Sequence, residues 1–213
     1  MIRRPPRSTL SSSSAASDVY KRQNMFHGQI VAITGSNGKT STKEISYLLL
    51  SFLTDKKSVF KSPKNWNNEL GLSLSLLGLN RKHKIGIFEI GTNQPGEIYS
   101  LSNFLKPDYG VITNIGRSHL ENLKNLDGVA KEKSDLFINV KSKGVCLART
   151  DNKYKKLISK KAVGKELKLL GNETKDIFDL NFEVAYLIVK EILNLERNSN
   201  VELSELKKRI QDN

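Results

Sequence analysis

One stretch limits what this chain can fold into more than any other: an apolar run, residues 30–33, followed by Thr-Gly-Ser-Asn-Gly-Lys-Thr-Ser-Thr, residues 34–42. The run has the length of a buried strand, and Gly35 and Gly38 let the backbone of the next turn approach a ligand closely. A helix that begins at Lys39 presents unpaired N–H groups. These donors, the positive helix end and the ammonium together suit a polyphosphate. Thr40 then supplies a hydroxyl for a Mg²⁺ ion between the phosphates.

The turn departs from the usual P-loop, because Ile33 stands where that motif has its first glycine. A strand-to-helix turn with an incidental lysine is the alternative interpretation. The order of strand, turn, helix and Gly-Lys-Thr-Ser-Thr favours a nucleotide phosphate site. Its predicted residues are Gly35, Ser36, Asn37, Gly38, Lys39, Thr40 and Ser41.

The charge balance bears on possible partners. The chain has 35 Lys and Arg against 22 Asp and Glu, a formal net charge of +13, which raises nucleic acid as a possible ligand. The lysines are scattered among Asn, Ile and Leu without interleaved aromatic residues. We therefore interpret the charge as a solvated surface with some attraction for anionic substrates, and we expect no nucleic-acid partner.

Cys146 is the single cysteine, which excludes a disulfide framework and a cysteine metal cluster. It lies in the apolar run of residues 144–148, which is typical of a buried, inert thiol. No apolar stretch approaches the roughly 20 residues that a membrane span requires. The sequence therefore predicts no membrane association and a cytoplasmic location.

Residues 1–23 differ from the rest of the chain. They combine Arg-Arg-Pro-Pro-Arg with a serine run and almost no apolar content, which predicts disorder. A signal peptide is excluded because no apolar segment follows the arginines, and a transit peptide is an alternative. Ser-Ala-Ala-Ser-Asp-Val-Tyr-Lys-Arg-Gln resembles translated sequencing-adapter sequence. We therefore expect a non-native leader, followed by a single domain over residues 24–213.

Predicted strands and helices alternate from residue 29 onward. The strands are predicted over residues 29–34, 58–61, 84–90, 109–115, 144–149 and 166–170. The helices are predicted over residues 39–53, 68–79, 96–105, 127–140, 152–162, 177–195 and 201–211. This alternation predicts an α/β fold with a mostly parallel sheet flanked by helices on both faces, and ligands at the carboxyl ends of its strands.

Two polar side chains follow predicted strands. Glu89 lies at the end of the third strand and could reach a Mg²⁺ ion held by Thr40, although a solvated glutamate fits the pattern equally well. His119 lies in a polar loop after the fourth strand rather than on an apolar face, which disfavours a core histidine. A neutral imidazole could ligate a metal there. Mg²⁺ prefers oxygen but tolerates one nitrogen ligand.

Five motifs together resemble the central ATPase domain of the Mur ligase family. They are the glycine-containing turn, Asn67-Asn68-Glu69-Leu70-Gly71, Phe88-Glu89-Ile90-Gly91, residues 114–119 and residues 130–137. The resemblance extends over residues 29–213 and implies the P-loop NTPase-like fold of that domain. It is greatest to the members that join D-Ala-D-Ala to UDP-MurNAc-tripeptide, because of Asn-Asn-Glu-Leu-Gly, Gly-Thr-Asn-Gln-Pro-Gly-Glu-Ile and Ser-His-Leu-Glu.

This resemblance implies ATP and Mg²⁺ as cofactors and assigns roles to individual residues. Lys39 would hold the β- and γ-phosphates, Thr40 and Glu89 would bind one Mg²⁺ ion, and His119 would bind a second. Lys133 matches the carbamylated lysine of the family, whose carbamate would add an oxygen ligand. From the residues alone, a charged helix face would be the default interpretation of this segment.

Two asparagines complete the implied site. Asn68 would lie near the γ-phosphate and the acyl substrate, and Asn181 would contact the adenine. The family's adenine-contacting pattern is His-Asn-x-x-Asn, and the His-Asn pair is missing here. The segment between Asp151 and Asp176 is also short for the family.

The implied reaction is ATP-dependent carbon–nitrogen ligation in bacterial peptidoglycan synthesis, through an acyl-phosphate. The resemblance covers the central domain alone, and we expect this sequence to be a fragment without the family's N-terminal UDP-sugar domain and C-terminal domain. We therefore expect the isolated chain to be a monomer that binds nucleotide weakly and ligates nothing. The alternatives are another Mur-type ligase, a folylpolyglutamate synthase and a non-catalytic nucleotide-binding module.

Overall fold

The computed structural model describes residues 26–150, 152–171, 176–195 and 203–212. The predicted leader, residues 1–23, lies outside them, as do residue 151 and residues 172–175 of the shortened segment. Within these ranges the centre of the molecule is a six-stranded sheet with the order β2-β3-β1-β4-β5-β6, in which every pairing is parallel. The strands are β1 (Gln29–Thr34), β2 (Val59–Lys61), β3 (Ile85–Glu89), β4 (Tyr109–Ile112), β5 (Val145–Arg149) and β6 (Glu166–Leu170).

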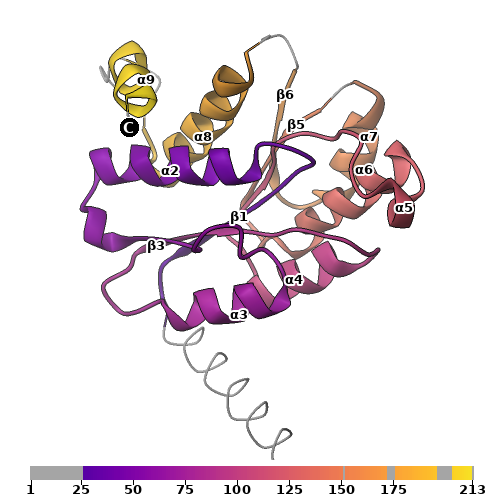
Figure 1. Cartoon of the computed structure of the whole chain (residues 1–213), viewed down its shortest axis with the longest axis horizontal. Coiled ribbons are helices and arrows are strands. Elements are labelled where there is room, and N and C mark those ends of the chain that lie inside the picture. Colours follow the sequence, from indigo (N-terminus) through magenta and orange to yellow (C-terminus); the bar gives the residue numbers. More distant parts are fainter. Residues whose placement is uncertain (1–25, 151, 172–175, 196–202, 213) are drawn as a thin grey trace, which may run out of the picture.

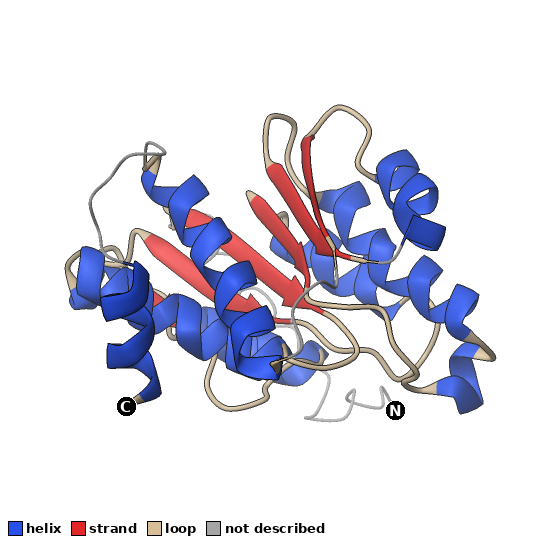
Figure 2. Cartoon of the chain, turned by 90° about the horizontal axis from the view of Figure 1, so that it is seen from above, coloured by secondary structure: helices blue, strands red, loops and turns tan. Residues whose placement is uncertain are grey.

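Helices cover both faces of the sheet (Figures 1 and 2). One face carries α2 (Lys39–Leu53), α8 (Ile177–Leu193) and α9 (Leu203–Gln211). The other carries α3 (Glu69–Leu77), α4 (Glu97–Leu105), α6 (Leu126–Ser134) and α7 (Asn152–Lys161), together with the 3₁₀ turn η2 (Asp135–Asn139). The short helix α5 (Leu120–Leu123) and the 3₁₀ turn η1 (Lys56–Ser58) complete the list. The α/β fold with helices on both faces is confirmed. In the described part, no helix is long and apolar enough to cross a membrane.

The sheet separates two apolar cores because the side chains of each strand point alternately to opposite faces. In β1, Ile30 and Ala32 belong to the same apolar core as residues of α3, α4 and α7, whereas Val31 and Ile33 share the other core with residues of α2 and α8. Strands buried on both faces therefore read as continuous apolar runs in the sequence. Cys146 is fully buried in β5, which confirms its predicted position in the core, and burial raises the pKa of its thiol to about 12, which disfavours the reactive thiolate.

The structure differs from the predicted elements mainly after β4. The strand ends at Ile112 rather than at residue 115, because the following residues leave the sheet and contact the loop after β1. The predicted helix over residues 127–140 is α6 followed by the 3₁₀ turn η2. This tightening lets the consecutive residues Leu136 and Phe137 both face the core at 0% exposure. The helix α5 was not predicted.

The loop after β1 lies where the connections from neighbouring strands leave toward opposite faces of the sheet. The helix after β1 lies on one face of the sheet, whereas the helices after its neighbours β3 and β4 lie on the other. The backbone therefore diverges around the carboxyl end of β1, which is where open α/β sheets form their ligand crevice. The loop lies at the right-hand end of α2 in Figure 1.

Candidate functional site

Two glycines allow the loop after β1 to take its path. Gly35 has φ 152° and Gly38 has φ 77°, and side chains rarely accept either value. A Cβ atom on Gly35 would lie 1.8 Å from Thr113 Oγ1, and one on Gly38 would lie 2.2 Å from Asn181 Oδ1. The first helical residue after Gly38 is Lys39, as predicted, and no side chain caps this helix. The N–H groups of the first turn of α2 are therefore available to an anion.

The loop after β4 braces this turn. Ser36 Oγ donates to the carbonyl of Gly116 over 2.8 Å and accepts from the N–H of the same residue over 2.9 Å. Ser118 Oγ donates to Ser36 Oγ over 2.9 Å, and Asn114 Oδ1 accepts from the N–H of Asn37 over 2.9 Å. The side chain of Ser36 thus binds the protein itself, while the turn as a whole is held rigidly at the sheet edge.

Two ammonium groups converge on one carbonyl of the loop. Lys39 Nζ and Lys133 Nζ each donate to the oxygen of Gly35 over 3.0 Å. Burial lowers the pKa of Lys39, while the charge of Glu89 opposes this effect. Lys133 is only 1% exposed, and burial, followed by the charge of Lys39, lowers its pKa to about 8. The turn thus concentrates positive charge where a polyphosphate would lie.

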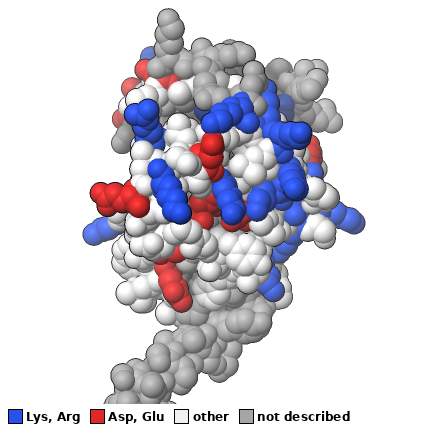
Figure 3. Space-filling model, turned by 90° about the vertical axis from the view of Figure 1, so that its right-hand side faces the viewer, with Lys and Arg blue, Asp and Glu red and all other residues white. Residues whose placement is uncertain are grey.

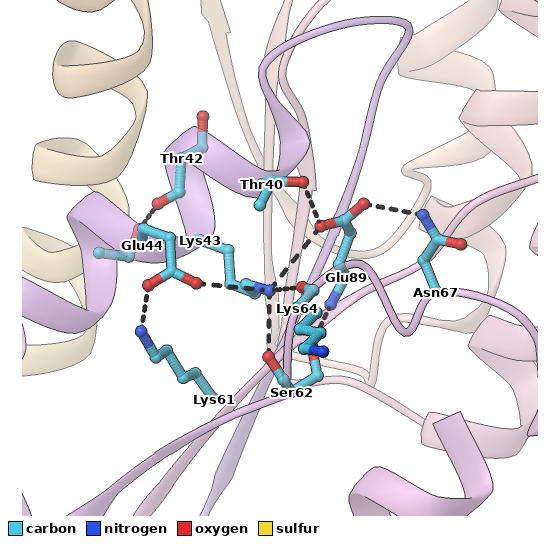
Figure 4. A network of polar contacts seen from close by, with 10 residues as sticks. Thr40, Thr42, Lys43, Glu44, Lys61, Ser62, Lys64, Asn67 and Glu89 are labelled. Carbon is cyan, nitrogen blue, oxygen red and sulfur yellow. Dashed lines mark hydrogen bonds and ion pairs between the residues drawn. The ribbon is translucent and has the colours of Figure 1, made fainter. Parts of the chain in front are cut away.

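A buried carboxylate faces the start of α2 (Figure 4). Glu89 at the end of β3 is 1% exposed, and its Oε2 accepts from Thr40 Oγ1 over 2.8 Å. Its Oε1 accepts from Asn67 Nδ2 over 2.8 Å, and the ammonium of Lys43 lies 3.9 Å from Oε2. The structure therefore brings together Thr40 and Glu89, which lie far apart in the sequence.

These groups fit a divalent metal in part. The Thr40 hydroxyl and the Glu89 carboxylate are oxygen donors 2.8 Å apart, which is the donor chemistry that Mg²⁺ prefers. Among the described residues, no group of three or more His, Cys, Asp or Glu side chains could hold a metal ion. An ion here would therefore depend on the hydroxyl and on ligands from outside that residue set, such as phosphate oxygens or a modified lysine.

His119 lies at the entrance of the site. It is exposed, has φ 51° and immediately precedes α5. Burial and then the charges of Lys133 and Lys39 lower its pKa, whereas Glu97 opposes them. The lowered pKa favours the neutral imidazole, which is the form that binds metals.

A cavity of about 1030 Å³ opens beside Lys39 and His119. It extends between α3 and α4 and has the size of a small-molecule site. Asn67, Asn68 and Glu97 contribute polar groups to its wall, and Leu70 and Phe104 contribute apolar surface.

The three remaining predicted residues have distinct surroundings. Asn68 lines the cavity and also caps α3, because its Oδ1 accepts from the N–H of Gly71 over 2.9 Å. Asn181 of α8 is 9% exposed and lies against Gly38. Ser41 is exposed in the first turn of α2.

We expect Asn68→Ala to lower the free energy of unfolding by about 1 kcal/mol, because one N–H of α3 loses its cap. Asn125→Ala is the matched control. Asn125 caps α6 in the same way, with its Oδ1 2.9 Å from the N–H of Gly128. Urea unfolding should give similar losses for the two variants. Wild-type stability of Asn68→Ala would contradict the capping role.

Three site residues were missed in the sequence. Asn67 directly precedes the predicted Asn68. Only one of two successive asparagines caps the following helix, so the side chain of the other can bind a different group. Nothing in the sequence around Lys43 indicates a role in the site, apart from its position one helical turn after Lys39. Glu132 is 4% exposed and accepts from the N–H groups of Gly96 and Ile98 over 2.7 and 2.9 Å, which fixes the start of α4 beside Lys133.

In Figure 3, which looks onto the right-hand side of Figure 1, Lys and Arg side chains are more prominent than those of Asp and Glu and lie among uncharged residues. This is the side on which the loop after β1 lies. A positive surface around a crevice raises the local concentration of anionic substrates.

Comparisons with known proteins agree with this geometry. The family described as the Mur ligase middle domain matches residues 33–204. UDP-N-acetylmuramoyl-tripeptide–D-alanyl-D-alanine ligase from Buchnera aphidicola subsp. Baizongia pistaciae is 37% identical over 65% of this chain and 31% of its own length. The ligase of the same name from Rickettsia prowazekii is 39% identical over 66% of this chain and 31% of its own. The MurF ligase of Thermotoga maritima, solved in complex with ADP, is 27% identical, with a TM-score of 0.73 over 91% of this chain and 52% of its own. The chain thus spans about a third of the length of these two sequence relatives.

Proposed function

The chain belongs to the Mur ligase family, and we propose that it forms the ATP-binding middle domain of a ligase that joins D-Ala-D-Ala to UDP-MurNAc-tripeptide. One observation carries the proposal at the level of chemistry. Thr40, in the first turn of α2, lies 2.8 Å from the buried carboxylate of Glu89, beside the ammonium of Lys39. A hydroxyl, a carboxylate and a lysine at a glycine-containing turn match what phosphoryl transfer requires.

The proposed reaction has two steps. A carboxylate oxygen of the UDP-MurNAc-tripeptide attacks the γ-phosphorus of ATP, which forms an acyl-phosphate and releases ADP. The amine of D-Ala-D-Ala then attacks the acyl carbon, phosphate leaves and the amine nitrogen loses a proton. The cavity of about 1030 Å³ beside Lys39 is where we propose that the activated carboxylate lies.

The chain's own residues would act on the phosphates. The N–H groups of residues 38–41 and the ammonium of Lys39 would bind the β- and γ-phosphate oxygens and orient the γ-phosphorus toward the cavity. Thr40 and Glu89 would hold one Mg²⁺ ion and His119 a second. When bound, Mg²⁺ supplies positive charge that stabilises the transferring phosphoryl group.

Lys133 is proposed to carry a carbamate. Carbamylation requires a neutral amine, and a pKa of about 8 leaves roughly a tenth of the amines neutral at pH 7, hundreds of times more than an ordinary lysine would have. The carbamate would replace a buried cation with an oxygen ligand for the metal.

Two asparagines and the chain as a whole complete the proposal. Asn181 would contact the adenine, since it lies against the phosphate turn at Gly38, and Asn68 would approach the acyl substrate from the cavity wall.

We further propose that residues 24–213 are the domain, preceded by a non-native leader, and that the protein is a monomer of the bacterial cytoplasm.

Titration of the chain with ATP, with Mg²⁺ and with EDTA, tests the proposal. We expect Mg²⁺ to tighten binding about tenfold, and Glu89→Gln to reduce this gain to below threefold, because the variant keeps the shape of the carboxylate and loses its charge. Glu205→Gln, which neutralises an exposed carboxylate on α9, is the control and should behave as wild type. Undetectable binding of ATP, or an undiminished Mg²⁺ gain in Glu89→Gln, would reject the proposed site.

A further inference from the structure

Lys43 is a cation with no exposed surface on the second turn of α2. Its ammonium donates to the carbonyl of Ser62 over 3.0 Å and, by a short contact, to the carbonyl of Lys64. It also lies 3.5 Å from the carboxylate of Glu44 and 3.9 Å from that of Glu89 (Figure 4). None of the roles described above uses this side chain.

Burial of an ammonium on the packed face of a helix is energetically unfavourable. Removing a charge from water is unfavourable unless partners replace its hydration, and well-packed apolar residues of similar size often stabilise a protein as much or more. A cation at this position is therefore better explained by what it positions than by its contribution to stability.

The partners of Lys43 belong to the segment between β2 and α3, residues 62–68. Besides its carbonyl contact, Ser62 accepts from the N–H of Glu89 through its Oγ over 3.2 Å. Lys64 has φ 46°, so the chain bends sharply at the second carbonyl that Lys43 holds. Lys43 thus pins one end of the segment to α2, the helix that carries the phosphate turn.

The other end of this segment reaches the carboxylate of Glu89, the proposed metal ligand, and the cavity. Asn67 donates to Glu89 Oε1 over 2.8 Å, and its carbonyl accepts from the N–H of Gly91 over 2.7 Å. The next residue, Asn68, lines the cavity. The pinned segment therefore carries one of the two side chains that hydrogen-bond the Glu89 carboxylate in the described part of the structure.

We propose that Lys43 is a positioning residue that holds residues 62–68 against α2, and with them the Asn67 amide that orients the Glu89 carboxylate, and thereby sets the Mg²⁺-dependent part of nucleotide binding. The inference rests on the proposed function, because it assumes that Glu89 binds Mg²⁺ beside a nucleotide. It adds a direct connection between the phosphate turn and the wall of the substrate cavity.

The single tryptophan of the chain, Trp66, provides a probe that is independent of nucleotide. It lies within the pinned segment, is 38% exposed, and packs beside Gly71 of α3. Loss of the Lys43 contacts should free the segment. The acrylamide quenching constant of Trp66 should therefore rise about twofold.

The experiment compares wild type with Lys43→Met, which keeps the length of the side chain, and Lys43→Gln, which keeps a donor for the carbonyls. Lys61→Met is the matched control, because Lys61 also pairs with Glu44 but does not contact Glu89. ATP affinity is measured with Mg²⁺ and with EDTA, together with Trp66 quenching in the absence of nucleotide. We expect both Lys43 variants to lose most of the Mg²⁺ gain, falling from about tenfold to below threefold, with ATP affinity in EDTA within twofold of wild type. Lys61→Met should match wild type in all three measurements.

Three results would overturn the inference. One is an undiminished Mg²⁺ gain in both Lys43 variants, and another is an equal loss in Lys61→Met. The third is failure of both Lys43 variants to fold, which would assign the side chain to stability alone. If wild type itself fails to bind ATP, the proposed function fails, which differs from all three results because they are judged against a wild type that binds.

Discussion

Replacement of Lys39 by alanine is expected to weaken ATP binding by this chain roughly a hundredfold. Lys39 is the first residue of α2, and its ammonium lies 3.0 Å from the carbonyl of Gly35 in the turn. Hydrogen bonds to charged groups contribute about 1.5–3 kcal/mol, and about 2.7 kcal/mol corresponds to the expected loss. Calorimetric titration with Mg²⁺ and ATP measures it.

Lys57→Ala is the matched control, because this exposed lysine lies in η1 at the opposite end of α2 and should leave affinity within twofold of wild type. Lys39→Ala should also raise the pKa of Lys133, because the charge of Lys39 helps to lower it. Retention of nearly full ATP affinity by Lys39→Ala would show that the turn does not hold the phosphates.

Lys133 is expected to make the stability of the chain depend on pH in the alkaline range. Its pKa is about 8 in the folded protein and near 10.5 when the chain is unfolded. Between these values the unfolded state binds more protons than the folded state, so the free energy of unfolding rises with pH. Below pH 8 the buried charge makes a destabilising contribution of about 3 kcal/mol to the free energy of unfolding, and this contribution has disappeared above pH 10.5.

Lys133→Met removes this contribution. At pH 7 the variant should be more stable than wild type by about 2 kcal/mol, since the unfavourable burial of the charge is larger than the one hydrogen bond lost to Gly35. Its advantage should vanish as pH rises from 8 to 10.5. Urea unfolding at several pH values measures the difference between the two proteins. Lys131→Met, two residues earlier and exposed on the same helix, should leave the pH dependence unchanged.

Addition of bicarbonate provides a second test of Lys133. If the amine is carbamylated, bicarbonate should stabilise wild type at pH 7 and leave Lys133→Met unaffected, because the modification removes the buried positive charge. Equal responses of the two proteins would argue against a carbamate at this position.

Local sequence patterns predicted much of this fold, because strand, turn and helix depend on near neighbours. The apolar run before Gly35, the two glycines and the helix start at Lys39 lie within ten residues, and the structure confirms all of them. The alternation of apolar runs with helical periods predicted the sheet and its helical layers. Prediction was poorest after β4, where contacts with the loop after β1 end the strand early.

The convergence of the site depends on contacts that no local pattern contains. Glu89 meets Thr40 because β3 pairs beside β1 in parallel, so that both carboxyl ends reach one edge of the sheet. Lys133 reaches the carbonyl of Gly35 across 98 residues of sequence, and its burial there, followed by the charge of Lys39, lowers its pKa. In the sequence, Lys43 resembles a solvated helix lysine. In the structure it is fully buried, and its ammonium donates to the carbonyls of Ser62 and Lys64. The chain's residue types thus specify which chemistry is available, whereas strand order and burial decide which groups meet and which charges they carry.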